Sequence, residues 1–435
     1  MNEDSTFGFK GFAILFAFLV IGFAGAQSQP GGQFDLLTKV VRKPVKVATA
    51  TTTTTTTTTS TATAPTTSTT TTAATTGTSN SVYSESTAVP SGFDANSLLL
   101  PTSIPSSAAP DVVGAFRFIC SAGQLLRDDP VVYPGQPGKS HLHQFYGNLA
   151  ANANSTYASL RQNGGSSCEG GNGTTTAVNR SAYWMPAMLD GIGNVVRPDF
   201  ISIYYKRRPI SDPKCSLTSG DPKAEGNCVP LPNGLRFVFG YDMLTGQAPT
   251  GSLYFTCQGP SSTATASYPN MVEAIARCPA TPTAVRQADG SFKNEYNRLG
   301  AVINAPSCWD GKNLDSPNHR DHVAYGGYGW WGYFKCPPTH PYVIPGFTLG
   351  AWFRVDENLG TWRLSSDDMM PGTVPGTTFH ADWFGAWDNQ VQAMWTDNCI
   401  NKLLNCSAGN LGNGKIINGM GGSFTANPRL VRVPA

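Results

Sequence analysis

Short runs of apolar residues dominate the pattern of the chain beyond its N-terminal part. They are rich in β-branched and aromatic residues, and Gly, Pro, Asn or Asp bounds each of them, as strands and turns require. The runs are DVVGAFRFIC (111–120), DFISIYYK (199–206), GLRFVFGY (234–241), GSLYFTC (251–257) and FTLGAWFRV (347–355). The pattern predicts β-strands that are joined by turns and long loops.

Helical spacing of apolar residues is scarce and is clear only late in the chain, in DNQVQAMWTDNCINKLL from Asp388. An Asp at this position can cap a helix N-terminus. The apolar residues near helical spacing are Val391, Met394, Trp395, Ile400 and Leu403. We find no internal repeat. The sequence therefore predicts a mainly β fold, a single β-sandwich-like domain with long loops and one late helix.

The first residues have the features of a secretory signal peptide, predicted over residues 1–26. Lys10 precedes an apolar run from Gly11 to Phe23, and Ala24-Gly25-Ala26 offers a small-residue cleavage site. The run is shorter than the roughly 20 residues that span a bilayer. We therefore expect a secreted or cell-surface protein with no stable membrane span after signal cleavage.

Residues 27–110 are predicted to form a disordered linker rich in Thr, Ser and Pro. Between Ala48 and Asn80 the chain is almost entirely Thr, Ala and Ser, with a run of consecutive threonines from Thr51. Such a segment cannot bury enough apolar area to offset its chain entropy. Residues 111–435 remain for the β-rich domain, and the linker would then act as a stalk.

Charge and cysteine content narrow the functional classes. The chain has 30 Lys and Arg against 28 Asp and Glu, and its longest basic run, Lys206-Arg207-Arg208, is typical of a solvated loop. This balance argues against a nucleic-acid partner. The ten cysteines form an even number behind a secretory signal, which indicates disulfides. Their spacing lacks C-x-x-C pairs and so argues against a structural zinc site.

Disulfides would pin the long loops of such a domain. Two pairs of cysteines lie close enough in sequence to suggest local bonds, Cys215–Cys228 and Cys399–Cys406. We expect most of the ten cysteines to be paired.

Five of the six histidines fall in three short stretches. His141 and His143, in SHLHQFYGN, would point to the same face of a strand. His319 and His322, in SCWDGKNLDSPNHRDHVAY, would share one face of a helical turn. His380 completes the set in HADW. The concentration of histidines in a histidine-poor chain predicts that the three stretches meet at one site.

Carboxylates accompany these histidines. Asp315 and Asp321 flank the second pair, and Asp382 follows His380 by two residues. Neutral imidazole suits Zn, Cu, Mn or Fe, and a carboxylate can ligate the metal or orient a ligand. The five histidines are therefore candidate ligands of a divalent transition metal, and all eight residues are candidate catalytic groups.

Two other readings of the His/Asp set remain open. Without a metal, a His/Asp pair can act as a general acid and base. The same residues can also hydrogen-bond long loops with no catalytic role.

The aromatic residues allow a sugar-binding surface as well as a core. Tryptophans can stack on pyranose rings, but aromatic side chains also supply large buried areas. The tryptophans considered for such a platform are Trp309, Trp330, Trp331, Trp383 and Trp387.

Several longer motifs occur in a fixed order between Val112 and Cys406. They are SHLHQFYGN, NRSAYWMPAM, LPNGLRFVFGYDM, SCWDGKNLDSPNHRDHVAY, CPPTHPYVIP and HADWFGAWD. With these motifs the chain resembles the secreted fungal and bacterial domain-of-unknown-function family numbered nineteen-ninety-six. Similar proteins often have a pair of cysteines near Cys168, where this chain has one. The resemblance implies secretion and one domain, and it implies no reaction.

Two functional classes are consistent with the sequence. The first is a secreted enzyme that acts on extracellular or cell-wall polysaccharide through the His/Asp site. The second is a non-catalytic wall or surface protein that binds glycan and is held out on its Thr-rich stalk. A histidine cluster in a cleft would favour the enzyme, whereas a flat aromatic surface would favour the binding protein.

Overall fold

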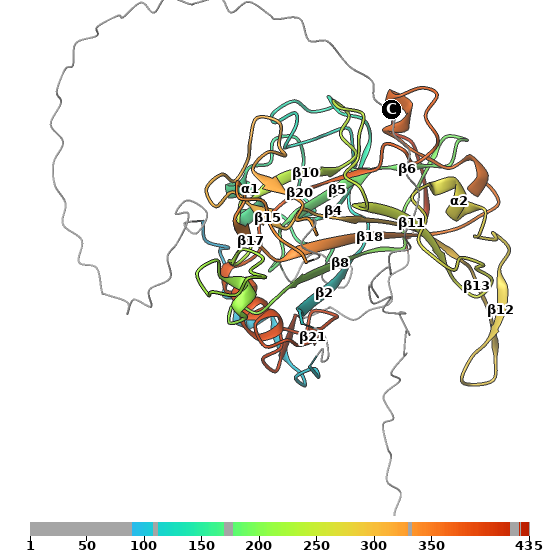
Figure 1. Cartoon of the computed structure of the whole chain (residues 1–435). Helices are drawn as coiled ribbons and strands as arrows, with labels where there is room; N and C mark the ends of the chain where they lie inside the picture. The colour runs from blue at the N-terminus through green and yellow to red at the C-terminus, as the bar shows by residue number, and fades with distance from the viewer. Residues whose placement is uncertain are drawn as a thin grey trace, which may run out of the picture. The chain divides into compact units, whose positions relative to one another are not determined.

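The computed structural model describes residues 89–107, 112–168, 177–328, 333–417, 426 and 428–434 (Figure 1). All of them belong to one compact unit, Gly77–Ala435. The predicted signal peptide and most of the predicted linker lie outside the described residues. None of the helices in these segments is long and apolar enough to cross a membrane.

Two large sheets build the fold, which is mainly β as predicted. The six-stranded sheet has the order β11 (Leu253–Gln258), β14 (Arg298–Asn304), β18 (Gly346–Arg354), β8 (Phe200–Arg207), β2 (Gly114–Cys120) and β21 (Asn405–Cys406). The five-stranded sheet has the order β10 (Arg236–Gly240), β20 (His380–Phe384), β5 (Ala182–Pro186), β4 (His143–Gly147) and β3 (Leu125–Leu126). Each of the five predicted strand runs overlaps one of these strands.

The main core lies between the two sheets. Along β8 every second side chain is buried, as in a strand with one face on a core. Phe347 of β18 packs against Phe237 of β10 and Trp383 of β20, with ring centroids 6.3 and 5.4 Å away. The buried hydroxyls of Tyr183 and Tyr205 lie 2.8 Å apart and join β5 to β8. The predicted sandwich is thus confirmed.

Smaller sheets and short helices surround the sandwich. The smaller sheets are β1 (Leu99–Pro101) with β22 (Lys415–Ile417); β12 (Thr283–Arg286) with β13 (Phe292–Glu295); β16 (Val323–Ala324), β15 (Cys308–Trp309), β17 (Tyr342–Val343) and β9 (Asn227–Cys228); and β19 (Arg363–Leu364), β6 (Met188–Leu189), β7 (Asn194–Val196) and β23 (Leu430–Arg432). The α-helices are α1 (Tyr157–Gln162), α2 (Met271–Ile275) and α3 (Asn389–Trp395). Short 3-10 segments span Ala95–Leu98, Pro213–Cys215, Leu359–Thr361 and Asp367–Met369.

The late helix forms where the apolar pattern predicted it. The side chain of Asp388 accepts hydrogen bonds from the backbone N–H groups of Gln390 and Val391, which caps α3. A π-helical turn, Thr396–Ile400, continues α3. Leu403 lies beyond the helix with a φ of 55°, so the helix is shorter than the apolar spacing suggested.

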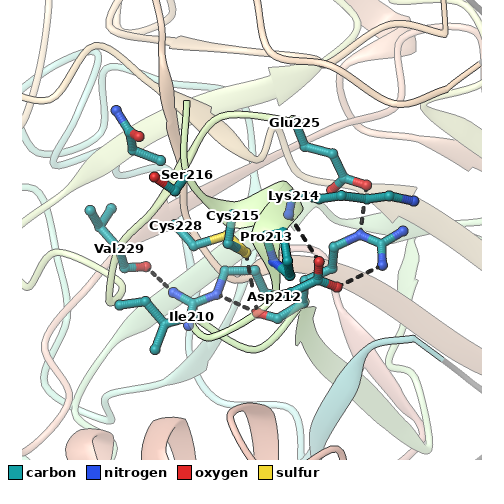
Figure 2. Close-up of a disulfide and its surroundings, with 12 residues drawn as sticks. Ile210, Asp212, Pro213, Lys214, Cys215, Ser216, Glu225, Cys228 and Val229 are labelled. Atoms are coloured by element: carbon teal, nitrogen blue, oxygen red, sulfur yellow. Dashed lines mark hydrogen bonds and ion pairs between the residues drawn. A yellow bond between two sulfur atoms is a disulfide. The ribbon is translucent and has the colours of Figure 1, made fainter. Parts of the chain in front are cut away.

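Five disulfides pin the loops: Cys120–Cys168, Cys215–Cys228, Cys257–Cys278, Cys308–Cys336 and Cys399–Cys406. Both predicted local bonds are present. Figure 2 shows the Cys215–Cys228 bond beside Asp212 and Glu225, two carboxylates that both contact Arg208. No cysteine of the described segments is free, which is consistent with an oxidising, extracellular environment.

Candidate metal centre

A polar group lies on the face of the five-stranded sheet that points away from the main core. Alternation along the strands places Trp383 in the main core and its neighbour Asp382 on the other face. A second, smaller apolar cluster covers part of this outer face and includes Val131, Trp184 and Val238. The central strands β4, β5 and β20 are therefore buried on both faces.

The register of three strands brings His143 and His380 near each other. Phe145 of β4 and Asp382 of β20 both oppose Trp184 of β5, and His143 opposes Pro186. Continuing the β20 register by two residues places His380 on the other side of Pro186. The ring centroids of His143 and His380 lie 6.2 Å apart.

His141 completes a group of three imidazoles. It lies two residues before β4, and its ring centroid is 4.2 Å from that of His143 and 5.1 Å from that of His380. One ring nitrogen from each histidine lies within 4.8 Å of the others, an arrangement that could hold a metal ion. His141 is the partly exposed member, while His143 and His380 are buried.

Hydrogen bonds to backbone carbonyls orient two of the rings. The Nδ1 atom of His143 lies 2.9 Å from the carbonyl oxygen of Asp128, and Nδ1 of His380 lies 2.8 Å from that of Thr378. A carbonyl can only accept, so each Nδ1 carries the proton and Nε2 keeps its lone pair. The buried Nε2 atoms of His141 and His143 have no hydrogen-bond partner in the described segments.

Burial keeps all three imidazoles neutral. It lowers the pKa of His143 to about 4 and, together with the neighbouring His143, that of His380 to about 4. Burial, His143 and His380 also hold the pKa of His141 far below its usual value. Neutral imidazole is the form that binds a metal ion.

Two carboxyl groups complete the centre. Ligand-type oxygens of Asp129 and Asp382 lie within 4.8 Å of each other and of a ring nitrogen of His143. Both carboxylate oxygens of Asp382 are buried, and within the described part of the chain neither has a hydrogen-bond partner. Burial, and then the charge of Asp129, raise the pKa of Asp382 well above its ordinary value.

Asp129 was not among the predicted site residues. Its carboxylate accepts hydrogen bonds from the backbone N–H groups of Val131 and Val132, at 2.9 and 2.8 Å. These bonds lower its pKa less than burial raises it. The sequence signal that could have revealed Asp129 is the pair Asp128-Asp129, which follows Leu125-Leu126 closely. The pairing of β3 with β4 sets Leu126 opposite His143 and so brings the Asp pair near that histidine.

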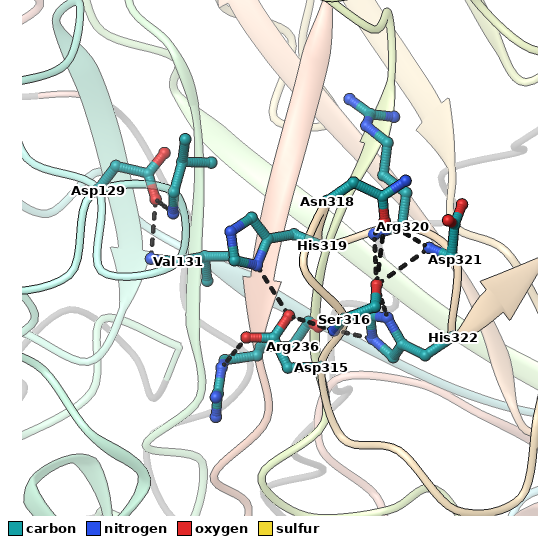
Figure 3. A network of polar contacts seen from close by, with 11 residues as sticks. Asp129, Val131, Arg236, Asp315, Ser316, Asn318, His319, Arg320, Asp321 and His322 are labelled. Carbon is teal, nitrogen blue, oxygen red and sulfur yellow. Dashed lines mark hydrogen bonds and ion pairs between the residues drawn. The ribbon is translucent and has the colours of Figure 1, made fainter. Parts of the chain in front are cut away.

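The structure leaves His319, His322, Asp315 and Asp321 outside this group. Nδ1 of His319 lies 2.8 Å from Oδ1 of Asp315, whose Oδ2 receives the Nε–H of Arg236 at 2.8 Å (Figure 3). The His322 ring lies between Ser316 Oγ and the carbonyl oxygen of Arg236, both at 2.9 Å. Asp321 is exposed.

The backbone explains why this second pair of histidines is separate. The His319 carbonyl accepts the N–H of Val238, so the segment runs along the outer edge of β10 and not across β20. His319 also has a φ of 57°, which breaks the helical turn that the H-x-x-H spacing suggested. We therefore leave these four residues out of the proposed centre.

The structure also places the tryptophans of the predicted sugar platform. Trp309, Trp383 and Trp387 are fully buried, as the core interpretation of the aromatic residues expects. Trp330 and Trp331 lie outside the described residues.

Comparison with protein families identifies the chain. The model of the family described as "Domain of unknown function (DUF1996)" matches residues 129–387. The chain belongs to this family. This confirms the resemblance seen in the motifs. No similar curated protein and no similar solved structure was found. The DUF1996 match begins at Asp129 and includes His141, His143, His380 and Asp382.

Proposed function

We propose that the chain is a secreted metal-dependent enzyme that acts on an extracellular or cell-wall polysaccharide. His141, His143 and His380 would bind a divalent transition metal, and Asp382 would lie beside it. One observation carries this proposal: both oxygens of the buried Asp382 carboxylate lack a hydrogen-bond partner among the residues that the structure describes. Buried polar atoms are nearly always paired, so unpaired ones suggest a group that binds there.

The donor set supports a metal. Three neutral imidazoles with an adjacent carboxylate suit Zn, Fe, Mn or Cu. Metal-binding histidines usually donate their other ring N–H to a carbonyl or carboxylate, as His143 and His380 do here. A bound cation would also offset the electrostatic cost of burying Asp382 and Asp129 together.

The arrangement supports hydrolysis. A metal bound at such a site supplies a more acidic water and a Lewis acid. Asp382 would accept a proton from a reacting water, because its buried carboxylate oxygens form no hydrogen bond within the described residues. Two backbone N–H groups hold the carboxylate of Asp129 in place near Asp382.

Secretion remains part of the proposal. Five disulfides support an oxidising compartment. The predicted signal peptide and Thr-rich linker would export the domain and hold it away from its point of attachment. The alternative, a non-catalytic glycan-binding wall protein, gains no support from the three described tryptophans of the platform because they are buried.

Elemental analysis of the purified chain tests the metal. We expect about one transition-metal ion per chain, lost in His141→Ala and kept in His340→Ala. His141 is the least buried ligand, so its variant should fold, and His340 is a matched control outside the centre. Equal metal content in both variants would refute the centre. We expect Asp382→Asn to keep the metal and to lose polysaccharide hydrolysis.

A further inference from the structure

In the loop between β3 and β4 the acidic residues are buried and the basic residues are exposed. Asp128 and Asp129 are buried, and the carboxylate of Asp128 accepts the N–H groups of Gly138 and Ala153 at 2.9 and 3.0 Å. The two basic side chains of the loop, Arg127 and Lys139, are exposed. The exposed charges of the loop are therefore positive, and they lie close in sequence to His141, the partly exposed member of the proposed centre.

Arg127 lies next to His141. The N–H of Ser140 donates to the Arg127 carbonyl oxygen at 3.0 Å, which brings the two ends of the loop together. The positive charge of Arg127 also contributes to lowering the pKa of His141, after burial and the two other imidazoles. Within the described segments, the Arg127 guanidinium forms no hydrogen bond and no ion pair, and its donors remain available to a ligand.

A second guanidinium lies on the other side of the imidazoles. Nη1 and Nη2 of Arg320 donate to the carbonyl oxygens of Gly240 and Tyr241, at 3.3 and 3.0 Å, and Gly240 opposes His380 in the sheet. Arg320 also lines a hollow of about 390 Å³ together with Asp242 and Asp321. Neither carboxylate forms an ion pair with Arg320 in the described part of the chain.

We propose that the substrate of the centre is an anionic polysaccharide, with carboxylate groups that contact Arg127 and Lys139 beside His141, and Arg320 beside His380. This inference rests on the proposed function and names its substrate class. A guanidinium binds a carboxylate through two parallel hydrogen bonds, and exposed positive charge raises the rate of encounter with a polyanion. The buried tryptophans offer no competing stacking surface for a neutral glycan.

Calorimetric binding to the full metal-loaded chain tests the substrate class. The probes are polygalacturonate, alginate and hyaluronate, with methyl-esterified polygalacturonate as a neutral control of the same backbone. We expect at least one carboxylated polymer to bind, and any binding of polygalacturonate to weaken at least tenfold on esterification and to weaken with salt. If none of the three binds, or if the ester binds as well as the acid, the proposal is overturned.

Variants test the residues. Arg127→Gln should weaken binding about tenfold, the effect of losing one charge-assisted contact. Lys139→Gln should weaken it less, because an ammonium group does not form the paired contact. Arg286→Gln is the matched control, since Arg286 is exposed on β12, in a separate hairpin. Unchanged binding in Arg127→Gln, or equal losses in Arg127→Gln and Arg286→Gln, would refute the assignment.

Two further measurements separate the alternatives. If inorganic phosphate binds in an Arg127-dependent way while no carboxylated polymer does, the ligand is a phosphate and the carboxylate assignment fails. Metal content is measured on the same samples. Anion binding in a chain that holds no metal would refute the proposed metal centre and support the anionic ligand. A bound metal without anion binding would support the metal centre and refute the anionic ligand.

Discussion

Replacing Gly240 by Ala should disturb both the stability of the sandwich and the geometry of the imidazole group. Gly240 has a φ of 87°, in the left-handed region that favours glycine. A Cβ atom there would lie 2.4 Å from Cδ1 of Ile303, 2.9 Å from the Phe379 carbonyl oxygen and 3.1 Å from Cα of His380. The first contact can relax through a side chain, whereas the other two involve backbone.

Two terms set the size of the effect. Left-handed backbone costs alanine about 1–2 kcal/mol, partly offset by about 0.4–1 kcal/mol from the stiffer unfolded chain. Overpacking adds about 1–3 kcal/mol. Gly251 provides the matched control, because it has a φ of 72° and a Cβ atom added to it would meet nothing within 4 Å. We expect Gly251→Ala to cost about 1 kcal/mol and Gly240→Ala about 2–4 kcal/mol.

Urea unfolding with the disulfides intact measures both variants, and metal content reports on His380. The Gly240 variant should bind metal more weakly than the Gly251 variant, because its new methyl group presses on the backbone of His380. Equal unfolding free energies for the two variants would show that the Cβ contacts relax without cost, and the packing argument would then be wrong.

Three other changes have expected outcomes. Replacing both cysteines of Cys120–Cys168 should lower the free energy of unfolding by about 4 kcal/mol, and replacing those of Cys399–Cys406 should lower it by about 2.5 kcal/mol. The first loss is larger because the bond closes a loop of 48 residues and the second closes one of 7 residues. Urea unfolding of the two variants checks which loss is larger. Burial alone would raise the pKa of Asp315, but the hydrogen bond from His319 and the charge of Arg236 outweigh it and leave the pKa lowered. The contribution of the Asp315 carboxylate to the free energy of unfolding is therefore present above its unfolded pKa and is lost as the pH falls through its folded pKa. Asp315→Asn should therefore destabilise the chain by about 0.5–1 kcal/mol at about pH 6 and have little effect below about pH 3, a difference that unfolding at the two pH values measures. Added Zn²⁺ at about 100 times its Kd should raise the unfolding free energy by about 2.7 kcal/mol in the wild type and not in His141→Ala.

The five predicted runs match β2, β8, β10, β11 and β18, and they leave out β14, β5 and β20, in which nearly every residue is buried. In β8 the alternation of buried and partly exposed residues is visible in the sequence. In β5 and β20 every residue is buried, and β20 carries His380 and Asp382 among its apolar residues. A periodicity of two cannot appear where both faces are covered, so these strands were not recognised.

The candidate site was predictable in part for a similar reason. The sequence predicted His141 and His143 on one face of a strand; their rings do lie together, although His141 belongs to the loop before β4. That His380 joins them depends on the β4–β5–β20 register, and local spacing does not encode such pairing. His319 and His322 lie outside the group of three imidazoles, and the helical turn that their spacing suggested is absent because the backbone at His319 is left-handed.

The division of the three imidazoles between strand and loop has a kinetic consequence. His143 and His380 sit on strands whose amides are bonded within the sheet, while His141 belongs to the loop that Asp128 ties down through Gly138 and Ala153. Local opening costs far less free energy than unfolding a whole sandwich. A metal in the proposed centre could therefore exchange when this one loop opens, with both sheets intact. The exchange rate would follow the hydrogen-exchange protection of the loop and not the global stability of the protein.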